Sequence, residues 1–223
     1  MQTTGTAKRW IDNYLVIDLE TNGLDFHDMH AVQLGWCLVD KLKLVTNETV
    51  EIMLPPGASL SEGAVDVHGL TREHLQEEGA PPEVVFQEFG RHLKALLGKG
   101  VTLVGHNLLR FDTNVLDLSF KRYGIDLRLF CMSPIIDTGL IFKARNNRLK
   151  RTKTENIWEF GKRIAGLRVH GKWNLDFCLQ HFGIEYTRLL HDSGEDCSLT
   201  RMLLQAMLDN NWLEDIGWDP VAL

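Results

Sequence analysis

The first 54 residues contain three apolar runs rich in β-branched and aromatic side chains, separated by turn-like stretches: residues 14–18, 31–39 and 44–54. Such runs predict β-strands, and short connections between consecutive strands favour antiparallel pairing. Beyond residue 80, strand-like and helix-like segments alternate instead. An antiparallel meander followed by this alternation predicts an α/β fold with a mixed central sheet flanked by helices.

The segments after residue 54 differ in how clearly they signal their structure. A loop with one helical turn is expected at 55–71, and Thr71 is a helix N-cap candidate. The clearest helix is 81–100, with proline at its start, apolar residues at three- and four-residue steps, and glycine at its end. The remaining expectations are a buried strand at 101–107 and helices at 112–124, 137–145, 174–182 and 195–208.

Length and composition predict one globular domain spanning residues 1–223, with its core at about 14–208. The chain has 223 residues and is 44% hydrophobic, within the range of a single domain of up to roughly 250 residues. No apolar run approaches the ~18 residues of a spanning helix, and no secretory leader is recognisable. We therefore expect a cytoplasmic protein without a membrane partner. The scattered cysteines predict reduced core thiols, not disulfides or a zinc site: Cys37, Cys131, Cys178 and Cys197.

Positive charge is concentrated in one segment of an otherwise acidic chain. Residues 143–172 hold ten Lys and Arg against two Glu, a net +8, which leaves the rest at −14 of a total of −6. We expect a basic insertion at about 143–173, formed as a long insertion or a partly mobile loop. A solvated charged face is one interpretation. A nucleic-acid-tracking surface with interleaved aromatics is favoured, with these candidate contacts: Lys150, Arg151, Lys153, Trp158, Phe160 and Trp173.

Two carboxylates, Asp18 and Glu20, close the first predicted strand in the stretch "YLVIDLE". Side chains two apart on a strand share a face, so these carboxylates converge. At ~4 Å they repel by about 4 kcal/mol at an effective dielectric of 20. A solvated strand end with two unrelated acids is the alternative to a metal site. A divalent cation would turn the repulsion into binding, and hard oxygen ligands select Mg²⁺ or Mn²⁺.

Two later stretches supply further ligands. "GHNLLRFD" places Asp112 just past a buried strand, and "HDSGED" places His191 and Asp196 at the start of the last long helix. Four carboxylates can hold two metal ions about 4 Å apart, the arrangement that stabilises both the attacking and the leaving oxygen in phosphodiester hydrolysis. The sequence therefore predicts a two-metal site.

These stretches resemble, in order and spacing, the motifs of the DEDDh 3′-to-5′ exonucleases, the DnaQ-like group with the proofreading epsilon subunit of bacterial DNA polymerase III, ribonuclease T and oligoribonuclease. "IDLETNGL" resembles the first motif, "GHNLLRFD" the second, and His191 followed by Asp196 the third. "VHGLT" and "DTGLIFKAR" resemble the stretches between them. The resemblance covers about residues 14–208 and implies an RNase H-like fold.

The resemblance also implies roles for the acids and the histidine. Asp18, Glu20, Asp112 and Asp196 would bind two divalent ions, with Asp18 shared between them. His191 would be the general base for the attacking water, since a neutral imidazole accepts a proton at physiological pH. The flanking acids are expected to be ordinary helix-start residues favoured by the macrodipole, not ligands: Asp192 and Glu195.

Several neighbouring residues are implied in substrate binding. The turn of Thr21, Gly23 and Leu24 would cradle the terminal nucleotide, with Leu24 as a wedge under the base; a core position is the alternative. His68 is either a contact to the terminal nucleotide or a plain loop histidine. The second motif adds two candidates, of which the first would steady the site and the second either packs in the core or stacks at the scissile end: Asn107 and Phe111.

The sequence thus predicts a metal-dependent 3′-to-5′ exonuclease that releases nucleoside 5′-monophosphates from single-stranded or frayed 3′ ends. DNA is the preferred substrate and a DNA polymerase a candidate partner. An exoribonuclease or oligoribonuclease is the alternative enzyme, because 2′-hydroxyl contacts would decide between them. A binding module with a dead site is disfavoured, because binding alone would not require all four acids and the histidine.

Overall fold

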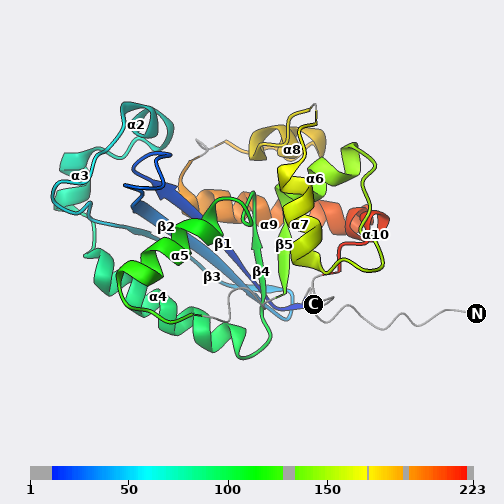
Figure 1. Ribbon diagram of the computed structural model, residues 1–223, viewed down its shortest axis with the longest axis horizontal. Coiled ribbons are helices and arrows are strands. Elements are labelled where there is room, and N and C mark those ends of the chain that lie inside the picture. Colours follow the sequence, from blue (N-terminus) through cyan, green and yellow to red (C-terminus); the bar gives the residue numbers. More distant parts are fainter. Residues whose placement is uncertain (1–11, 128–133, 170, 188–190, 220–223) are drawn as a thin grey trace, which may run out of the picture.

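The computed structural model describes residues 12–127, 134–169, 171–187 and 191–219. Its sheet has the order β3-β2-β1-β4-β5 (Figure 1). The pairs β1–β2 and β2–β3 are antiparallel, and β1–β4 and β4–β5 are parallel, which confirms the mixed sheet of an RNase H-like fold. The strands are β1 Tyr14–Thr21, β2 Ala31–Asp40, β3 Lys43–Glu51, β4 Thr102–Gly105 and β5 Ile135–Asp137.

Helices cover both faces of this sheet. α9 crosses one face over β1 and β2, while α4 and α5 lie on the opposite face (Figure 1). The helices are α2 Glu62–His68, α3 Arg72–Glu77, α4 Pro82–Leu97, α5 Asp112–Arg122, α6 Thr138–Asn146, α7 Ile157–Gly166, α8 Leu175–His181, α9 Ser193–Asp209 and α10 Trp212–Ile216.

Local sequence signals explain where several elements start. The Thr71 hydroxyl accepts the His74 N–H and so caps α3, as expected. Pro82 opens α4, where a missing N–H costs nothing. The apolar stripe of α4 is buried against the rest of the fold, which confirms the amphipathic helix: Val85, Phe89, Leu93 and Leu96.

Three expected boundaries are wrong. The third strand ends at Glu51 and not at 54, with Ile52 making only an isolated bridge to Ala80. Residues 62–68 form a seven-residue helix, α2, capped by Ser61, where one helical turn was expected. The helix expected from 137 begins at Thr138, because Asp137 ends the short strand β5 and its side chain caps α6.

The basic segment is not a loop-like insertion. Its centre is α7, which starts with a reciprocal capping box between Asn156 and Glu159. Ile157, Phe160 and Ile164 on this helix are fully buried. The segment therefore contributes to the main hydrophobic core.

The core also extends past its expected end at residue 208. α10 follows α9 and buries its apolar side, and the Trp218 indole donates to the Ile135 carbonyl at 2.9 Å. Cys37, Cys178 and Cys197 are free and buried, whereas Cys131 lies outside the described residues. No helix within the described ranges is long and apolar enough to span a bilayer.

Candidate active site

The carboxyl end of β1 carries the first two acids. β1 is central, between β2 and β4, and its buried residues Leu15, Val16 and Ile17 hold it in place. Asp18 and Glu20 share one face, as the two-residue period of a strand requires. Each remains partly accessible beyond the buried part of the strand.

The N-terminus of α9 is held against this strand end by unusually close packing. A Cβ on Gly35 of β2 would lie 2.3 Å from the Ser193 carbonyl carbon and oxygen, so only glycine fits there. Gln33 accepts the Ser193 N–H at 2.8 Å, and its amide donates to Asp192 at 3.3 Å. Asp192 in turn accepts the N–H groups of Gly194 and Glu195. Asp192 is thus the helix cap, as expected of a non-ligand acid.

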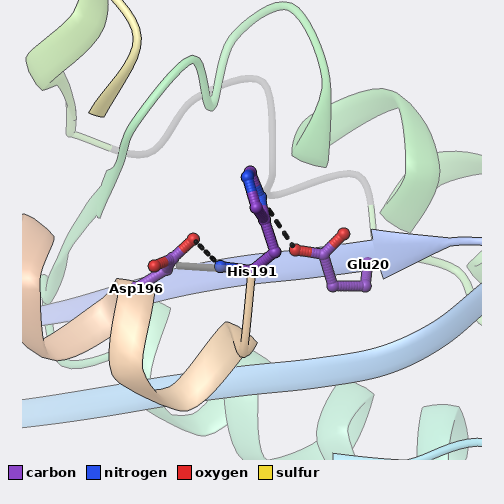
Figure 2. Close-up of side chains that lie close together, drawn as sticks. All are labelled: Glu20, His191 and Asp196. Atoms are coloured by element: carbon purple, nitrogen blue, oxygen red, sulfur yellow. Dashed lines mark hydrogen bonds and ion pairs between the residues drawn. The ribbon is translucent and has the colours of Figure 1, made fainter. Parts of the chain in front are cut away.

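α9 brings His191 and Asp196 to Glu20 (Figure 2). One ligand atom from each of these three residues lies within 4.8 Å of the other two. The ring atom Nδ1 of His191 is 3.8 Å from Glu20 Oε1. The backbone N–H of His191 donates to Asp196 Oδ2 at 3.2 Å. His191 has a left-handed backbone, φ +78°, which is uncommon outside glycine and turns its ring toward the acids.

Asp112 joins the site from the other side of β1. It is the first residue of α5 and is buried, and its Oδ1 accepts the Leu19 N–H at 3.0 Å. This bond attaches the start of α5 to the strand between Asp18 and Glu20.

All four carboxylates have raised pKa values. Burial is the main cause that raises the pKa of Asp18 well above its usual range. The negative charges of Asp112, Asp196 and Glu20 raise it further. Burial and the neighbouring Asp196 and Asp112 raise the pKa of Glu20 to about 8. Burial also raises the pKa of Asp112, and that of Asp196 to about 6. Asp18 has the most acidic neighbours and is therefore the central carboxylate.

The donor set fits divalent metal ions. Asp196 Oδ1 is buried and has no hydrogen-bond partner among the described residues, which a coordinated cation would satisfy. The cluster consists of hard carboxylate oxygens and one imidazole, a set that suits Mg²⁺ or Mn²⁺. Positive charge at its centre would also relieve the repulsion between the four acids.

The turn after β1 carries the residues expected to hold the terminal nucleotide. Thr21 is buried, and its hydroxyl donates to the Gly23 carbonyl at 2.9 Å. Leu24 is 80% exposed, which excludes the alternative of a core position. Sequence reasoning missed Asn22, which is buried and organises the turn: its amide donates to Asp28 and Ser59 carbonyls and accepts the His30 N–H.

His68 is the last residue of α2 and faces the site. Its Nδ1 accepts the Leu70 N–H at 3.0 Å, so Nε2 carries the proton that bonds the Thr21 carbonyl at 3.3 Å. Burial lowers the pKa of His68, and the hydrogen bond to the Thr21 carbonyl opposes this shift in part. His68 is thus a helix-end residue close to His191 and the turn.

The β4–α5 turn, residues 106–111, holds the two candidates of the second motif. Asn107 is exposed with φ +67°, and Phe111 is half-buried and packs against the core. The turn is fixed by the buried Asp137, which sequence reasoning did not assign to the site. Its carboxylate accepts the N–H groups of Asn107 and Leu109 and caps α6 at Leu140.

The three basic candidates lie before α7. Lys150 and Lys153 are exposed, whereas Arg151 donates to the Gly217 and Glu155 carbonyls. Among the aromatics of the segment, Phe160 is fully buried against Trp218, so it cannot stack on a base.

A family comparison covers most of the chain. The model of the RNase T group, described as "Exonuclease", matches residues 15–204. The chain therefore belongs to this exonuclease family, whose members are 3′-to-5′ nucleases that hydrolyse nucleic acid and use divalent metal ions.

Individual relatives extend the comparison. The PolC-type DNA polymerase III of Lacticaseibacillus paracasei is 26% identical over 166 residues, which cover 73% of this chain and 10% of the polymerase. The corresponding polymerase of Streptococcus mutans is 29% identical over 126 residues, covering 56% of this chain and 8% of the polymerase. The chain thus spans about a tenth of the length of these relatives.

Solved structures share the fold at lower identity. E. coli exonuclease I in complex with a dA16 oligonucleotide has a TM-score of 0.68 at 18% identity, covering 91% of this chain and 42% of that chain. Cell-death related nuclease 4 has a TM-score of 0.62 at 18% identity, covering 89% of this chain and 64% of that chain.

Proposed function

We propose that this chain is a 3′-to-5′ exodeoxyribonuclease that removes nucleoside 5′-monophosphates from single-stranded or frayed DNA ends. One observation carries the proposal: Glu20 of β1 and Asp196 of α9 converge with His191, and a buried carboxylate oxygen of Asp196 has no hydrogen-bond partner among the described residues. Asp112 of α5 is hydrogen-bonded to β1 between Asp18 and Glu20. A fold that needed only to bind nucleic acid would gain nothing from this repulsion.

Asp18, Glu20, Asp112 and Asp196 would hold two divalent ions, with the central Asp18 shared. When bound, such ions neutralise charge on a phosphodiester and make water a better nucleophile. Without bound ions, the negative carboxylates would repel the scissile phosphate. Burial of Asp112 and Asp196 keeps bulk water from competing there.

His191 takes the proton of the attacking water. Its Nδ1 is directed at Glu20, which leaves Nε2 for that proton. The water oxygen bonds to phosphorus, and the bond from phosphorus to the 3′ oxygen of the preceding nucleotide breaks. That oxygen leaves as a hydroxyl after it takes a proton from solvent. The half-exposed ring can then return the proton to solvent.

The 3′-terminal nucleotide would lie against the turn of Thr21, Gly23 and Leu24. Leu24 projects into solvent and can slide beneath a base without losing core packing. His68 holds the turn through the Thr21 carbonyl, and Asn107 and Phe111 border the same site from the β4–α5 turn.

Two comparisons support DNA as the substrate. Several relatives of the chain are PolC-type DNA polymerases, and exonuclease I was solved with a dA16 oligonucleotide. A DNA polymerase is accordingly our proposed partner. We also propose that residues 1–223 act as one domain, since one apolar cluster joins residues from Tyr14 to Trp218.

The test is a time course on 5′-labelled single-stranded DNA and the matching RNA, with Mg²⁺, Mn²⁺ or EDTA. We expect a metal-dependent ladder that shortens from the 3′ end of DNA and is lost in the Asp18→Ala variant. A ladder on RNA alone would assign the enzyme to RNA, and no cleavage of either strand by the wild-type protein would refute the proposal.

A further inference from the structure

A basic cavity lies beside the β4–α5 turn. Its volume is about 730 Å³. Its lining contains three cationic side chains and a tryptophan, and no acidic residue is among the residues that line it: Arg110, Lys143, Ala165, Gly166, Leu167, Arg168, Val169 and Trp173.

Lys143 builds the wall of this cavity. It is buried, and its ammonium donates to the Leu167 carbonyl at 2.7 Å and lies 4.8 Å from the centre of the Trp173 ring. Burial lowers its pKa, and the nearby charge of Arg110 lowers it further. Arg110 and Lys143 thus repel one another as like charges.

The two arginines of the cavity are available to a ligand. Arg110 and Arg168 are exposed, and neither has a carboxylate partner within the described part of the chain. Two other arginines of the basic segment differ, since Arg145 pairs with Asp215 and Arg163 with Glu155. Unpaired like charges around a hollow favour an anion, and phosphate suits the guanidinium fork.

The cavity adjoins the turn that leads to Asp112. Arg110 lies two residues before Asp112, in the turn that leaves the carboxyl end of β4. His106 of this turn donates through Nε2 to the Trp173 carbonyl at 2.8 Å, which fixes the far wall. α2 and α7 lie on opposite sides of β1 (Figure 1). Asp18 and Glu20 of β1 therefore lie between α2 and α7, whose last residues line the cavity.

We propose that this cavity binds the phosphodiester backbone of the substrate strand on the 5′ side of the scissile bond, through Arg110 and Arg168. The inference rests on the proposed exonuclease function and gives the strand a direction: over the cavity, across the acids, and ending at Leu24. It also assigns strand binding to one end of α7. Lys150 and Lys153 lie before the other end, and a ten-residue helix spans about 15 Å.

Two substrates distinguish an effect on the cavity from an effect on the catalytic site. A single-stranded DNA decamer reaches both, whereas the p-nitrophenyl ester of thymidine 5′-monophosphate reaches only the terminal-nucleotide site. We expect Arg110→Ala and Arg168→Ala each to raise KM for the decamer about tenfold, the loss typical of one charge-assisted hydrogen bond. Each should reduce the salt slope of decamer binding by about one. Hydrolysis of the ester should stay within twofold.

Matched variants and outcomes complete the design. Lys99→Ala removes an exposed charge before β4, at the opposite edge of the sheet, and should leave both substrates unchanged. Arginine variants that match Lys99→Ala on the decamer, or that lose activity equally on both substrates, would overturn the proposal. So would a larger loss in a Lys150→Ala/Lys153→Ala double variant.

Failure of the exonuclease function itself is distinguishable. In that case the wild-type protein cleaves neither substrate. Fluorescence anisotropy of a labelled decamer in EDTA then still measures whether the arginines bind the strand: weaker binding in both variants supports the cavity, and binding equal to that of Lys99→Ala overturns it.

Discussion

The Leu19 backbone N–H and the Asp112 carboxylate are joined by a hydrogen bond of 3.0 Å between residues 93 positions apart in the chain. The bond binds the start of α5 to β1 between Asp18 and Glu20. Asp112 thus has a structural and a chemical function, which different substitutions can separate.

Asp112→Asn keeps an oxygen acceptor for Leu19 but removes the charge. We expect its Tm in EDTA to equal or exceed that of the wild-type protein, because a repelling buried carboxylate is gone. Activity should fall by at least about 10²-fold, as metal-ligand loss removes transition-state charge stabilisation. Asp112→Leu should lose both stability and activity. The Leu19 N–H would then be buried without an acceptor, which costs about 1–3 kcal/mol. Thermal melts and single-turnover assays measure the two effects; an active Asn variant contradicts the ligand assignment.

The raised pKa values predict how metal-free stability depends on pH. Glu20 and Asp196 have pKa values of about 8 and about 6 in the folded protein, against about 4 in an unfolded chain. The folded state therefore binds protons more tightly. Its free energy of unfolding is highest at acidic pH for these groups and falls as pH rises from about 4, through about 6 for Asp196 and through about 8 for Glu20. Within its window each group lowers it by up to about 1.4 kcal/mol per pH unit.

Melts in EDTA between pH 5 and 8.5 measure this slope. Glu20→Gln should flatten it at the upper end, and Mg²⁺ or Mn²⁺ should oppose it by binding the ionised acids. Glu73→Gln, an exposed acid of α3, is the control and should keep the wild-type slope. A Tm that rises with pH in EDTA would contradict the arrangement of acids.

His191→Gly tests the general base without straining the backbone. Glycine adopts the observed φ of +78° freely, whereas alanine would keep the cost of roughly 1–2 kcal/mol that a Cβ carries in this conformation. We expect kcat to fall by roughly 10²–10⁴-fold, with KM nearly unchanged. Added imidazole should restore part of the activity in the space left by the ring. Asp196→Ala is the comparison that imidazole should not rescue; equal rescue of both would rule out a specific role for His191.

Leu24 offers a prediction in which stability and activity separate. The side chain is 80% exposed. Leu24→Ser should therefore change the free energy of unfolding by no more than the roughly ±0.5 kcal/mol typical of surface substitutions. If Leu24 wedges beneath the terminal base, KM for DNA should rise severalfold. A folded variant with unchanged KM would exclude the wedge.

The acids were predictable from sequence because their cause is local. The two-residue period of β1 sets Asp18 and Glu20 on one face, and the short stretches around Asp112 and Asp196 follow a strand and open a helix. That all four acids meet at one site was predicted only from the family resemblance, because the sequence alone does not give distances between residues far apart in the chain.

The positioning residues were not predictable for a physical reason. Asn22, Gln33 and Asp137 act through hydrogen bonds to backbone groups, which any sequence possesses. β5 was missed because three residues carry too little periodicity, and α7 because its charges concealed its buried Ile157, Phe160 and Ile164. Net charge describes a segment's surface and says little about its fold.

The packing of α9 on β2 gives the last prediction. In Gly35→Ala the new methyl would lie 2.3 Å from the Ser193 carbonyl group, so α9 must move and carry His191 and Asp196 away from Glu20. We expect a loss of about 1–3 kcal/mol, the usual cost of overpacking, with a larger relative loss of activity. Gly63→Ala in α2 has nothing within 4 Å of its Cβ and should gain roughly 0.5–1 kcal/mol from helix propensity. Denaturant melts and decamer assays compare the two; a fully active Gly35→Ala enzyme would show that the site tolerates displacement of α9.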